Sequence, residues 1–493
     1  MAAALDTKAV TVADLLDDFR GDFSAAEISD LVLDSRDVRP GAAFIALAGE
    51  RTHGLEFARQ ALADGAAVVL FDPHEAAPER SETPPGRAVP VSGLRSRLGE
   101  LARRFYAGAA TRTTVTGVTG TNGKTTVTWL LAEALTQAGR TSGYIGTLGF
   151  GIVPQLSEHR LTTPDCLTLH REIALMPVSD VALEVSSIGL IQDRLAGIDV
   201  SGAVFTNLTH DHLDVHGSLE AYAQAKAQLF ARAELEHAVV NIDDAYAGVM
   251  LAATRADVRI LTVSVEGHRE ADLCGTIRRH SLDGMSLRVS GAYGEAVLDT
   301  ALIGRFNAMN LLCALGAMLN LDIPFEEACE CLSQAAAPPG RMERFGGGDR
   351  AHIVVDYAHS PDALARVLAT LRELAPGRLI CVFGCGGDRD ASKRAAMGAA
   401  AGRADFVVLT DDNPRGENPG EIIAGIMVGL SEHADVVVEH DRGRAIDLAI
   451  ESSAAGDVVL IAGRGHERLQ LRKGAAVEFD DRDRVAQTLR IGA

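Results

Sequence analysis

The sequence predicts an α/β protein built on parallel sheets and divided into about three domains. Its 493 residues exceed what one core supports, since a domain takes roughly 100–200 residues. From residue 112 onward, short β-branched runs alternate with helical stretches, and the same rhythm returns from residue 351. Such runs between amphipathic helices are typical of parallel strands covered by helices on both faces. Ligands of these folds bind at the carboxyl ends of the strands, so the polar residues that end each run are the candidates for a site.

Two breaks in this pattern predict the domain boundaries. A helical stretch at 93–108 is followed by a strand-like run at 111–120, which places one boundary near residue 110. The Pro-Pro-Gly at 338–340 ends an Ala- and Leu-rich helix and marks the other boundary. The predicted domains are therefore residues 1–110, 111–337 and 338–493.

Composition and charge exclude several classes of partner. The formal net charge is −20, from 67 acidic and 47 basic residues without a basic stripe, so we expect no nucleic-acid partner. No apolar run approaches the ~18 residues of a membrane span, and the first residues are acidic where a signal peptide is basic. Seven cysteines without CxxC pairs indicate reduced thiols. We expect a cytoplasmic protein without membrane insertion.

The segment VTGTNGKTT at 118–126 predicts a phosphate-binding loop between a strand and a helix. Its glycines allow backbone N–H groups to point inward, Lys124 reaches terminal phosphates, and Thr125 can hold Mg²⁺. Val118 stands where a strict Walker A motif has Gly. The alternative, a Gly-rich connection with a chance lysine, is disfavoured by the strand–loop–helix context. A nucleoside triphosphate site is predicted.

A group of acidic and imidazole side chains follows this loop in the chain. Glu184 ends one predicted strand, and His212 lies among acids in the segment 205–230. His212 and His216 are spaced as in a metalloprotease helix, but Leu213 replaces the required Glu, so a zinc site of that kind is rejected. Oxygen and imidazole groups near a phosphate loop suit Mg²⁺ bound with ATP. A histidine that only caps or packs remains the alternative.

Lys226 falls on a mainly apolar face of a predicted helix, together with Tyr222 and Leu229. Burying its ammonium beside a divalent cation would cost several kcal/mol. A carbamate would reverse the sign of the charge and provide two oxygen ligands. The spacing alone favours a lysine that extends to solvent.

Taken in order, several motifs resemble the Mur ligases. The motifs are GVTGTNGKTT, LEVSS, TNLTHDHLDVHGS, YAQAKAQLF, GRFNAMN, GRMERF and DYAHSPDAL. Their order is similar to that of the cytoplasmic members that add the third amino acid to UDP-N-acetylmuramoyl-L-alanyl-D-glutamate, and the likeness extends from residue 33 to 484. It implies an N-terminal UDP-binding domain, a central ATPase with a P-loop and a C-terminal Rossmann-like domain. We expect a monomer that requires ATP and two Mg²⁺ ions.

The resemblance also implies a reaction and a set of site residues. ATP would phosphorylate the free carboxylate of the substrate, and an amine would displace phosphate from the acyl phosphate to form an amide, a step of peptidoglycan synthesis that supports cell shape and division. The catalytic residues would be Lys124, His212 and a carbamylated Lys226. ATP would bind Gly120, Thr121, Asn122, Gly123, Lys124, Thr125, Thr126, Asn307, Arg341 and Asp356. Metal would bind Thr125, Glu184, His212 and Lys226. The UDP-linked peptide would bind Leu33, Ser35, Glu50, Arg51, Thr52, Thr162, Thr163, Ser186, Gln192 and Arg194.

Without the resemblance, plainer interpretations of some of these residues stay open. Asn307 could be a helix N-cap, Arg341 a linker charge, the Thr162–Thr163 pair a turn, and Arg194 a surface charge. The chain also departs from the family pattern. Ile188 replaces a frequent His, Arg464 a common Lys, and Leu161 a frequent Asn, which bears on details of substrate binding and not on the reaction.

Three predicted strand ends of the last domain point to the amino acid that is added. The segments 383–394, 410–417 and 461–467 would converge over one crevice. We expect Arg389, Asp412, Asn413, Pro414, Arg415, Gly463 and Glu467 to line it. Cationic and anionic groups together suit meso-diaminopimelate, which has a carboxylate and an amine at both ends, whereas lysine lacks the distal carboxylate. In the family, Asp-Asn-Pro-Arg is associated with diaminopimelate. A lysine-adding ligase, a folylpolyglutamate synthase-like ligase and a nucleotide-binding regulator remain alternatives.

Overall fold

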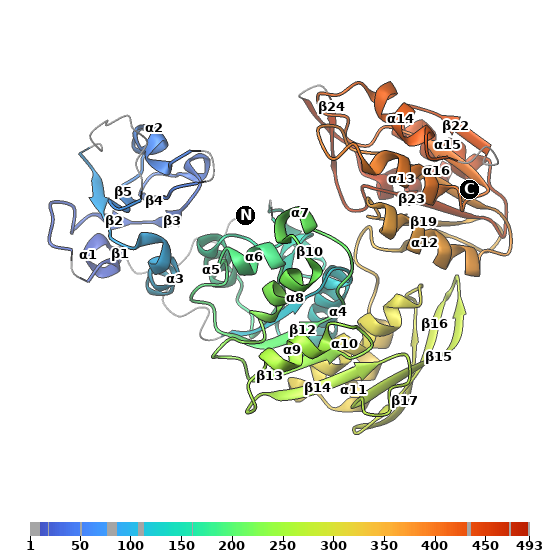
Figure 1. Cartoon of the computed structure of the whole chain (residues 1–493), viewed down its shortest axis with the longest axis horizontal. Helices are drawn as coiled ribbons and strands as arrows, with labels where there is room; N and C mark the ends of the chain where they lie inside the picture. The colour runs from blue at the N-terminus through green and yellow to red at the C-terminus, as the bar shows by residue number, and fades with distance from the viewer. Residues whose placement is uncertain are drawn as a thin grey trace. The chain divides into compact units, whose positions relative to one another are not determined.

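The computed structural model describes residues 10–17, 19–49, 52–75, 86–106, 113–159, 161–430, 435–472 and 475–491. Figure 1 shows the whole chain, coloured from its N-terminus to its C-terminus. Contacts within the chain divide it into two compact units, residues 1–262 and 263–493. The boundaries predicted near 110 and 337 each lie between two successive sheets of the chain. They remain predictions. Within the described ranges, no helix is both long and apolar enough to cross a bilayer.

The first unit begins with a small four-stranded parallel sheet of order β3-β4-β5-β6. Its core contains Leu31, Phe44 and Phe105, all fully buried. The elements of this segment are β1 (Val10–Thr11), α1 (Val12–Leu15), β2 (Glu27–Ile28), β3 (Asp30–Val32), η1 (Ser35–Asp37), β4 (Ala42–Ala46), η2 (Gly54–Phe57), α2 (Ala58–Ala63), β5 (Val68–Phe71), β6 (Ala88–Pro90) and α3 (Leu94–Phe105).

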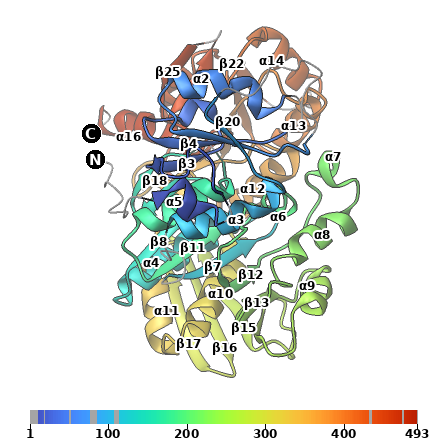
Figure 2. The same cartoon turned by 90° about the vertical axis from the view of Figure 1, so that its left-hand side faces the viewer.

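The strands of a larger, eleven-stranded sheet that begin within the first unit have the order β10-β9-β8-β11-β7-β12-β13-β14. Strands β8, β11, β7, β12 and β13 pair in parallel, and β9 and β10 add an antiparallel edge. The elements are β7 (Thr114–Thr119), α4 (Lys124–Gln137), β8 (Ser142–Gly146), β9 (Gly149–Ile152), β10 (Gln155–Ser157), α5 (Cys166–Leu175), β11 (Asp180–Glu184), α6 (Ser187–Ile191), β12 (Val200–Phe205), α7 (Leu213–His216), α8 (Leu219–Ala227), β13 (His237–Asn241), α9 (Ala247–Ala253) and β14 (Arg259–Ser264). Because β7 lies between β11 and β12, the loop after it opens at the centre of the carboxyl edge, and α4 packs on β7, β8 and β11 (Figure 2).

The second unit opens with an antiparallel ribbon of β15 (Leu273–Ser281), β16 (Gly284–Gly291) and β17 (Gly294–Thr300). Two helices follow, α10 (Phe306–Asn320) and α11 (Phe325–Gln334). Almost every residue of α10 is buried, which explains its Ala- and Leu-rich composition, because a helix that is apolar on all sides lies inside a protein.

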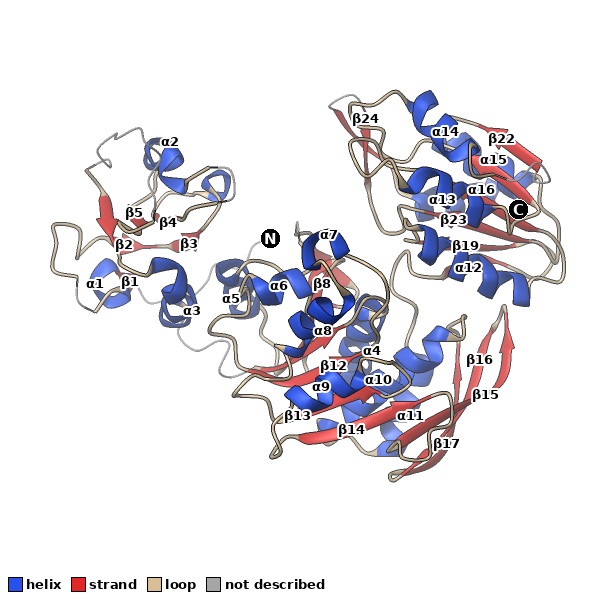
Figure 3. Ribbon diagram, viewed as in Figure 1, coloured by secondary structure: helices blue, strands red, loops and turns tan. Residues whose placement is uncertain are grey.

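A six-stranded sheet of order β18-β19-β23-β20-β21-β22 and a separate two-stranded antiparallel sheet of β24 and β25 belong to the rest of the second unit (Figure 3). In the six-stranded sheet the β18–β19 pair is antiparallel, and the other pairs of neighbouring strands are parallel. The elements are β18 (Glu343–Gly346), β19 (His352–Asp356), α12 (Pro361–Leu374), β20 (Leu379–Phe383), α13 (Lys393–Ala401), β21 (Phe406–Leu409), α14 (Pro419–Met427), β22 (Asp435–Val438), α15 (Arg442–Glu451), β23 (Val458–Ala462), β24 (Leu469–Arg472), β25 (Ala475–Glu478) and α16 (Asp481–Ile491).

Separate apolar clusters cover the two faces of this sheet. Residues of α12, α13 and α14 pack on one face, and residues of α15 and α16 pack on the other. Every residue of β11, β13, β20 and β23 is buried, as expected for strands covered on both sides. The predicted α/β class with mostly parallel sheets is confirmed.

Candidate functional site

The loop between β7 and α4 is held in place by the segment that follows β12. The Thr121 N–H donates to the Asn207 carbonyl at 2.8 Å, and the Asn122 N–H donates to the Asn207 side-chain oxygen at 3.0 Å. The Thr206 hydroxyl donates to the Asn122 carbonyl at 2.6 Å. A Cβ at Gly120 would lie 1.9 Å from the Thr206 hydroxyl oxygen, so a side chain there would displace the loop. The sequence had indicated no role for Thr206 or Asn207, although both follow a strand end beside the loop.

Lys124, the first residue of α4, lies over this loop. Its Nζ donates to the Gly120 carbonyl at 2.8 Å and to the Thr121 carbonyl at 2.9 Å. Gly123 immediately before it has a φ of +85°, in the left-handed region that glycine adopts without strain. The helix N-terminus and the lysine together form a site suited to the phosphates of a nucleotide.

Glu184 ends β11 with its carboxylate fully buried among hydroxyl groups. One oxygen accepts from the Tyr144 hydroxyl at 2.5 Å and from the Thr147 N–H at 2.9 Å. The other accepts from the Thr147 hydroxyl at 3.1 Å and from the Thr125 hydroxyl at 3.0 Å. The structure therefore brings Glu184 and Thr125 into direct contact and places a hydroxyl and a carboxylate side by side at the start of α4.

Lys226 on α8 is 1 % exposed, so the interpretation of a lysine that extends to solvent is wrong. Its Nζ donates to the Gly120 carbonyl at 2.9 Å and lies 4.2 Å from the centre of the Tyr222 ring. Burial, reinforced by the nearby charge of Lys124, lowers the pKa of Lys226 well below its usual value. Two lysine amines thus share one carbonyl oxygen, which favours a neutral amine at Lys226.

The rings of His212 and His216 both lie near the Tyr222 ring. The His212 side chain is about half exposed, the backbone φ of this residue is +52°, and its ring centre is 6.2 Å from that of Tyr222. The His216 ring is 4.8 Å from the Tyr222 ring, and its Nε2 lies 2.9 Å from the Ser187 hydroxyl. Burial and the charge of Lys226 lower the pKa of His216. His216 had no assigned role, although it shares a short motif with His212.

A cavity of about 670 Å³ opens beside the first sheet. Leu33, Ser35 and Thr52 line it, as expected for one binding region, whereas Glu50 and Arg51 lie outside the described residues. Asp165, Thr168 and Arg171 from the α5 region line the same cavity. Nothing in the sequence had indicated these three, because their approach to the first sheet is a tertiary contact.

The other residues expected to bind the peptide form one connected network. The Thr163 hydroxyl donates to the Glu184 carbonyl at 2.9 Å and accepts from the Ser186 N–H at 2.9 Å. Arg194 donates to the Thr163 carbonyl at 2.6 Å and to the Gln192 side-chain oxygen at 2.6 Å. A hydroxyl contact of 3.2 Å joins Thr162 to Thr147. Arg194 is thus partly buried and hydrogen-bonded to the threonine segment, whereas its plainer interpretation was a surface charge.

The second unit holds the remaining residues expected to bind ATP. Asn307 is buried in the first turn of α10 and donates to the Ile303 carbonyl at 2.7 Å. Arg305, not Asn307, is the N-cap of that helix, so the capping interpretation is wrong.

Arg341 and Asp356 lie at the end of β19. The Arg341 guanidinium carbon is 4.5 Å from the centre of the Tyr357 ring. The two Asp356 oxygens accept from the Met342 and Ala358 N–H groups, each at 2.8 Å. Burial raises the pKa of Asp356.

In the six-stranded sheet, β23, β20 and β21 are neighbours, so their carboxyl ends meet as predicted. Asn413 donates to the Glu467 carboxylate at 3.0 Å and accepts from the Leu471 N–H at 2.8 Å. Burial and the charge of Asp412 raise the pKa of Glu467. A Cβ at Gly463 would lie 2.9 Å from an Asp412 oxygen, which places Asp412 against this strand end.

Arg415 follows Pro414 with a φ of +51°, which is uncommon for an arginine and often marks a functional position. Its Nη1 donates to the Gly387 carbonyl at 2.8 Å, which ties two of the three loops together. Arg389 is exposed on the loop after β20. Arg464 is fully buried and donates to the Phe479 carbonyl at 3.0 Å, so this departure from the family pattern keeps a cation near Glu467.

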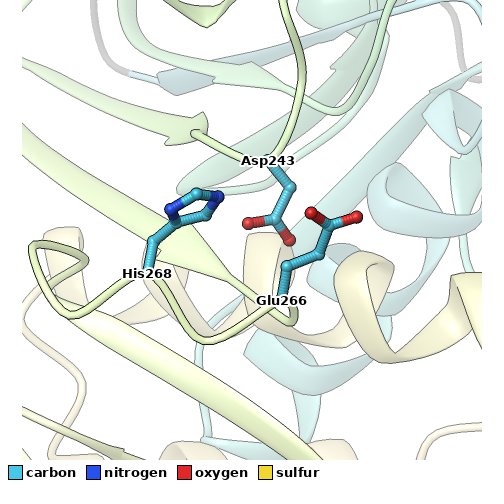
Figure 4. A group of neighbouring side chains, drawn as sticks. All are labelled: Asp243, Glu266 and His268. Carbon is cyan, nitrogen blue, oxygen red and sulfur yellow. The ribbon is translucent and has the colours of Figure 1, made fainter.

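Asp243, Glu266 and His268 are drawn in Figure 4. Asp243 follows β13 in the first unit, and the exposed residues Glu266 and His268 follow β14 in the second. Exposed acidic and imidazole side chains are common without a bound metal, and we assign no site to them.

Three family models match the chain in succession. Residues 27–106 match "Mur ligase family, catalytic domain", residues 118–318 match "Mur ligase middle domain", and residues 340–465 match "Mur ligase, glutamate ligase domain".

Two curated proteins with the name UDP-N-acetylmuramoyl-L-alanyl-D-glutamate--2,6-diaminopimelate ligase are among the similar sequences. The protein from Xylella fastidiosa (strain Temecula1) is 45% identical over 467 residues, covering 94% of this chain and 94% of the relative. The protein from Pseudomonas aeruginosa (strain PAO1) is 45% identical over 468 residues, covering 94% and 95%.

Solved structures agree with these sequence matches. A structure with the same ligase name is 36% identical, covers 98% of this chain and 99% of its own, and has a TM-score of 0.69. A folylpolyglutamate synthase from Mycobacterium tuberculosis, solved with ADP and AMPPCP, is 19% identical, covers 75% and 92%, and has a TM-score of 0.61, which shows a shared fold only.

Proposed function

This chain belongs to the Mur ligase family, and on that premise we propose that it is the ATP-dependent ligase that adds meso-diaminopimelate to UDP-N-acetylmuramoyl-L-alanyl-D-glutamate, a step of peptidoglycan synthesis. The main structural support for this reaction is the phosphate loop, where Lys124 and the buried Lys226 both donate to the Gly120 carbonyl. The buried Glu184 carboxylate reaches the Thr125 hydroxyl next to it.

The residues of this loop support transfer of a phosphoryl group between two anions. The N–H groups at the N-terminus of α4 and the Lys124 side chain would hold the ATP phosphates and reduce their repulsion with the carboxylate of the D-glutamate. Oxygen of that carboxylate attacks the γ-phosphorus, the bond to ADP breaks, and an acyl phosphate results. The neutral amine of the incoming amino acid then attacks the carbonyl carbon, and inorganic phosphate leaves as the amide forms.

Lys226 acts as a carbamate in this proposal. A neutral amine attacks CO₂ through its nitrogen lone pair, a C–N bond forms, and one proton leaves the nitrogen. Because the pKa of Lys226 is lowered, its amine is available in the neutral form. The carbamate anion would attract Lys124, whereas two lysine cations at the same carbonyl would repel each other. Burial of a carbamate next to a cation also costs less than burial of an unpaired ammonium.

The Thr125 hydroxyl and the Glu184 carboxylate fit Mg²⁺ as ligands, because this ion prefers oxygen ligands together with phosphate. Thr125 would hold one ion, and Glu184, His212 and the Lys226 carbamate a second. When bound, Mg²⁺ neutralises charge that develops on the transferred phosphoryl group. Gly120 to Thr126 would bind the phosphates of ATP. Asn307, Arg341 and Asp356 are likewise proposed as nucleotide contacts.

The UDP-linked peptide has two proposed binding regions in the first unit. The cavity lined by Leu33, Ser35 and Thr52, together with Glu50 and Arg51, would hold the nucleotide end. The peptide end would bind to the hydrogen-bonded network of Thr162, Thr163, Ser186, Gln192 and Arg194. In this network the Thr163 hydroxyl donates to the carbonyl of Glu184, next to the proposed site of phosphoryl transfer.

The loops after β20, β21 and β23 would select the amino acid. Arg415 and Arg389 would bind the distal carboxylate, and Asp412, Asn413 and Glu467 the distal amine, with Pro414 and Gly463 shaping the backbone. Lysine carries the distal amine but not the distal carboxylate. We propose further that the protein is a cytoplasmic monomer with domains at 1–110, 111–337 and 338–493.

Release of phosphate from ATP, measured over a panel of amino acids with and without the UDP-dipeptide, tests this function. We expect release with diaminopimelate only when the UDP-dipeptide is present. Preference for lysine would indicate the lysine-adding alternative, and release with folate substrates and glutamate the folylpolyglutamate synthase-like alternative. ATP binding without amino-acid-dependent release would indicate a regulator.

A further inference from the structure

A buried His159–Glu172 pair contacts the carbonyl of Gly146 and has no role in the reaction described above. His159 follows β10, and Glu172 lies in the middle of α5. Their side chains are 8 % and 3 % exposed. His159 Nδ1 is 3.0 Å from Glu172 Oε1, and His159 Nε2 is 2.5 Å from the Gly146 carbonyl oxygen. Both ring nitrogens are therefore engaged inside the protein.

The two contacts determine how many protons the pair holds. A carbonyl oxygen only accepts, so Nε2 carries a hydrogen, and the contact between Nδ1 and a carboxyl oxygen needs one more proton between them. Loss of that proton would leave a buried carboxylate facing a nitrogen lone pair. Burial alone would lower the pKa of His159, but the hydrogen bond and charge of Glu172 outweigh it and raise the pKa. Burial raises the pKa of Glu172.

The Gly146 carbonyl connects this pair to Glu184. Gly146 is the last residue of β8, and the next residue, Thr147, donates its N–H and its hydroxyl to the two Glu184 oxygens at 2.9 and 3.1 Å. His159 therefore binds the carbonyl of the Gly146–Thr147 peptide group, and the N–H of the same group binds the Glu184 carboxylate. Thr147 also contacts the Thr162 hydroxyl at 3.2 Å, three residues after His159 in the chain.

We propose that His159 and Glu172 are positioning residues that hold the Gly146–Thr147 turn, and thereby orient the Glu184 carboxylate for a divalent cation. This rests on the proposed role of Glu184 in the ligase. The other charged groups that act on the pair are Glu184 on His159, and Arg171 and Asp165 on Glu172. Because residues that orient a metal ligand typically affect metal affinity about 10–100-fold, the effect is measurable by direct binding.

The chain offers variants that separate positioning from packing. His159→Phe keeps a ring against Phe150, whose ring centre is 6.4 Å away, but cannot donate to Gly146. Glu172→Gln can donate its amide N–H to Nδ1 of a neutral ring, which leaves the Nε2–H bond to Gly146 in place.

His170→Phe is the matched control. His170 lies on the same helix as Glu172, is 1 % exposed, and its Nε2 also contacts a backbone carbonyl, that of Ala196 at 3.0 Å. The His170 contact leads to a different segment of the chain, so its loss removes a bond of the same kind without touching the Gly146–Thr147 turn.

The test is calorimetric titration of Mn²⁺ into the full-length protein saturated with AMPPCP, with the Mg²⁺ dependence of ADP formation as a second readout. We expect His159→Phe to weaken Mn²⁺ binding about tenfold or more. Glu172→Gln should bind Mn²⁺ within about twofold of the wild type, and so should His170→Phe, even where its Tm falls as far as that of His159→Phe. Should His159→Phe not fold, Glu172→Ala takes its place with the same expected loss.

Equal Mn²⁺ affinity in His159→Phe and wild type would overturn the proposal, and so would equal losses in His159→Phe and His170→Phe. Glu172→Gln that binds as weakly as His159→Phe would also contradict it. Wild-type protein that binds Mn²⁺ but forms no amide with diaminopimelate would refute the proposed function and leave this comparison valid.

Discussion

Replacing Arg415 by Ala tests the proposed choice of amino acid. Its Nη1 is occupied by the Gly387 carbonyl, whereas Nε and Nη2 have no hydrogen-bond partner within the described ranges of the chain. One paired contact with a ligand carboxylate is therefore open to this side chain. A hydrogen bond to a charged group contributes about 1.5–3 kcal/mol, which corresponds to roughly 10- to 150-fold in affinity. Ala also meets the positive φ as a non-glycine residue, as Arg does, so the backbone cost changes little.

The assay is kcat/KM for diaminopimelate and for lysine, followed by ADP formation. We expect the value for diaminopimelate to fall by about 10- to 150-fold and the low value for lysine to change little, because lysine has no distal carboxylate to lose. Arg415→Lys is the control that keeps the charge but not the paired geometry, and it should lie between wild type and Arg415→Ala. An unchanged preference for diaminopimelate in Arg415→Ala would refute the assignment, as would an equal loss for both amino acids.

Three further outcomes follow from the geometry. Lys226→Ala should abolish ligation and recover part of it with a short carboxylate such as acetate, which replaces the carbamate; full activity of the variant would contradict the carbamate. Gly120→Ala should weaken ATP binding by about tenfold or more, because its Cβ would lie 1.9 Å from the Thr206 hydroxyl, and Gly120→Ala combined with Thr206→Ala should recover part of the loss if that contact is the cause. Burial lowers the pKa of His466 from its usual value near 6.5 to about 3 in the folded protein. Between these two pH values the unfolded chain binds a proton that the folded protein does not, so the free energy of unfolding is highest above pH ~6.5 and decreases as the pH falls towards 3. In urea unfolding, His466→Phe should reduce the pH slope of the unfolding free energy in this window by up to about 1.4 kcal/mol per pH unit, and an unchanged slope would show that His466 does not titrate there.

Several features of the site could be read from short segments of the chain. The phosphate loop, the carboxylate that ends β11 and the turn that carries Arg415 each consist of residues close in sequence, and their backbone conformation depends on local rules for glycine, proline and strand ends. The α/β class followed from the length and spacing of apolar runs, because a buried parallel strand needs apolar residues on both faces.

Contacts between distant segments could not be predicted in this way. The solvent-extended interpretation of Lys226 failed because the helical pattern shows which face a residue occupies, not what covers that face. In the same way, the bond between Arg194 and the Thr163 carbonyl joins residues 31 positions apart, and the capping interpretation of Asn307 failed when α10 began at Phe306.

By itself, the sequence determined the class of the fold, the order of its motifs and the chemical groups available at each strand end, because these depend on local patterns. Only the tertiary structure decided that Lys124 and Lys226 share the Gly120 carbonyl and that His159 reaches Glu184 through the Gly146–Thr147 turn. The reason is physical: burial and the approach of like or opposite charges set the pKa values and orientations of these groups, and both arise only when distant segments pack together.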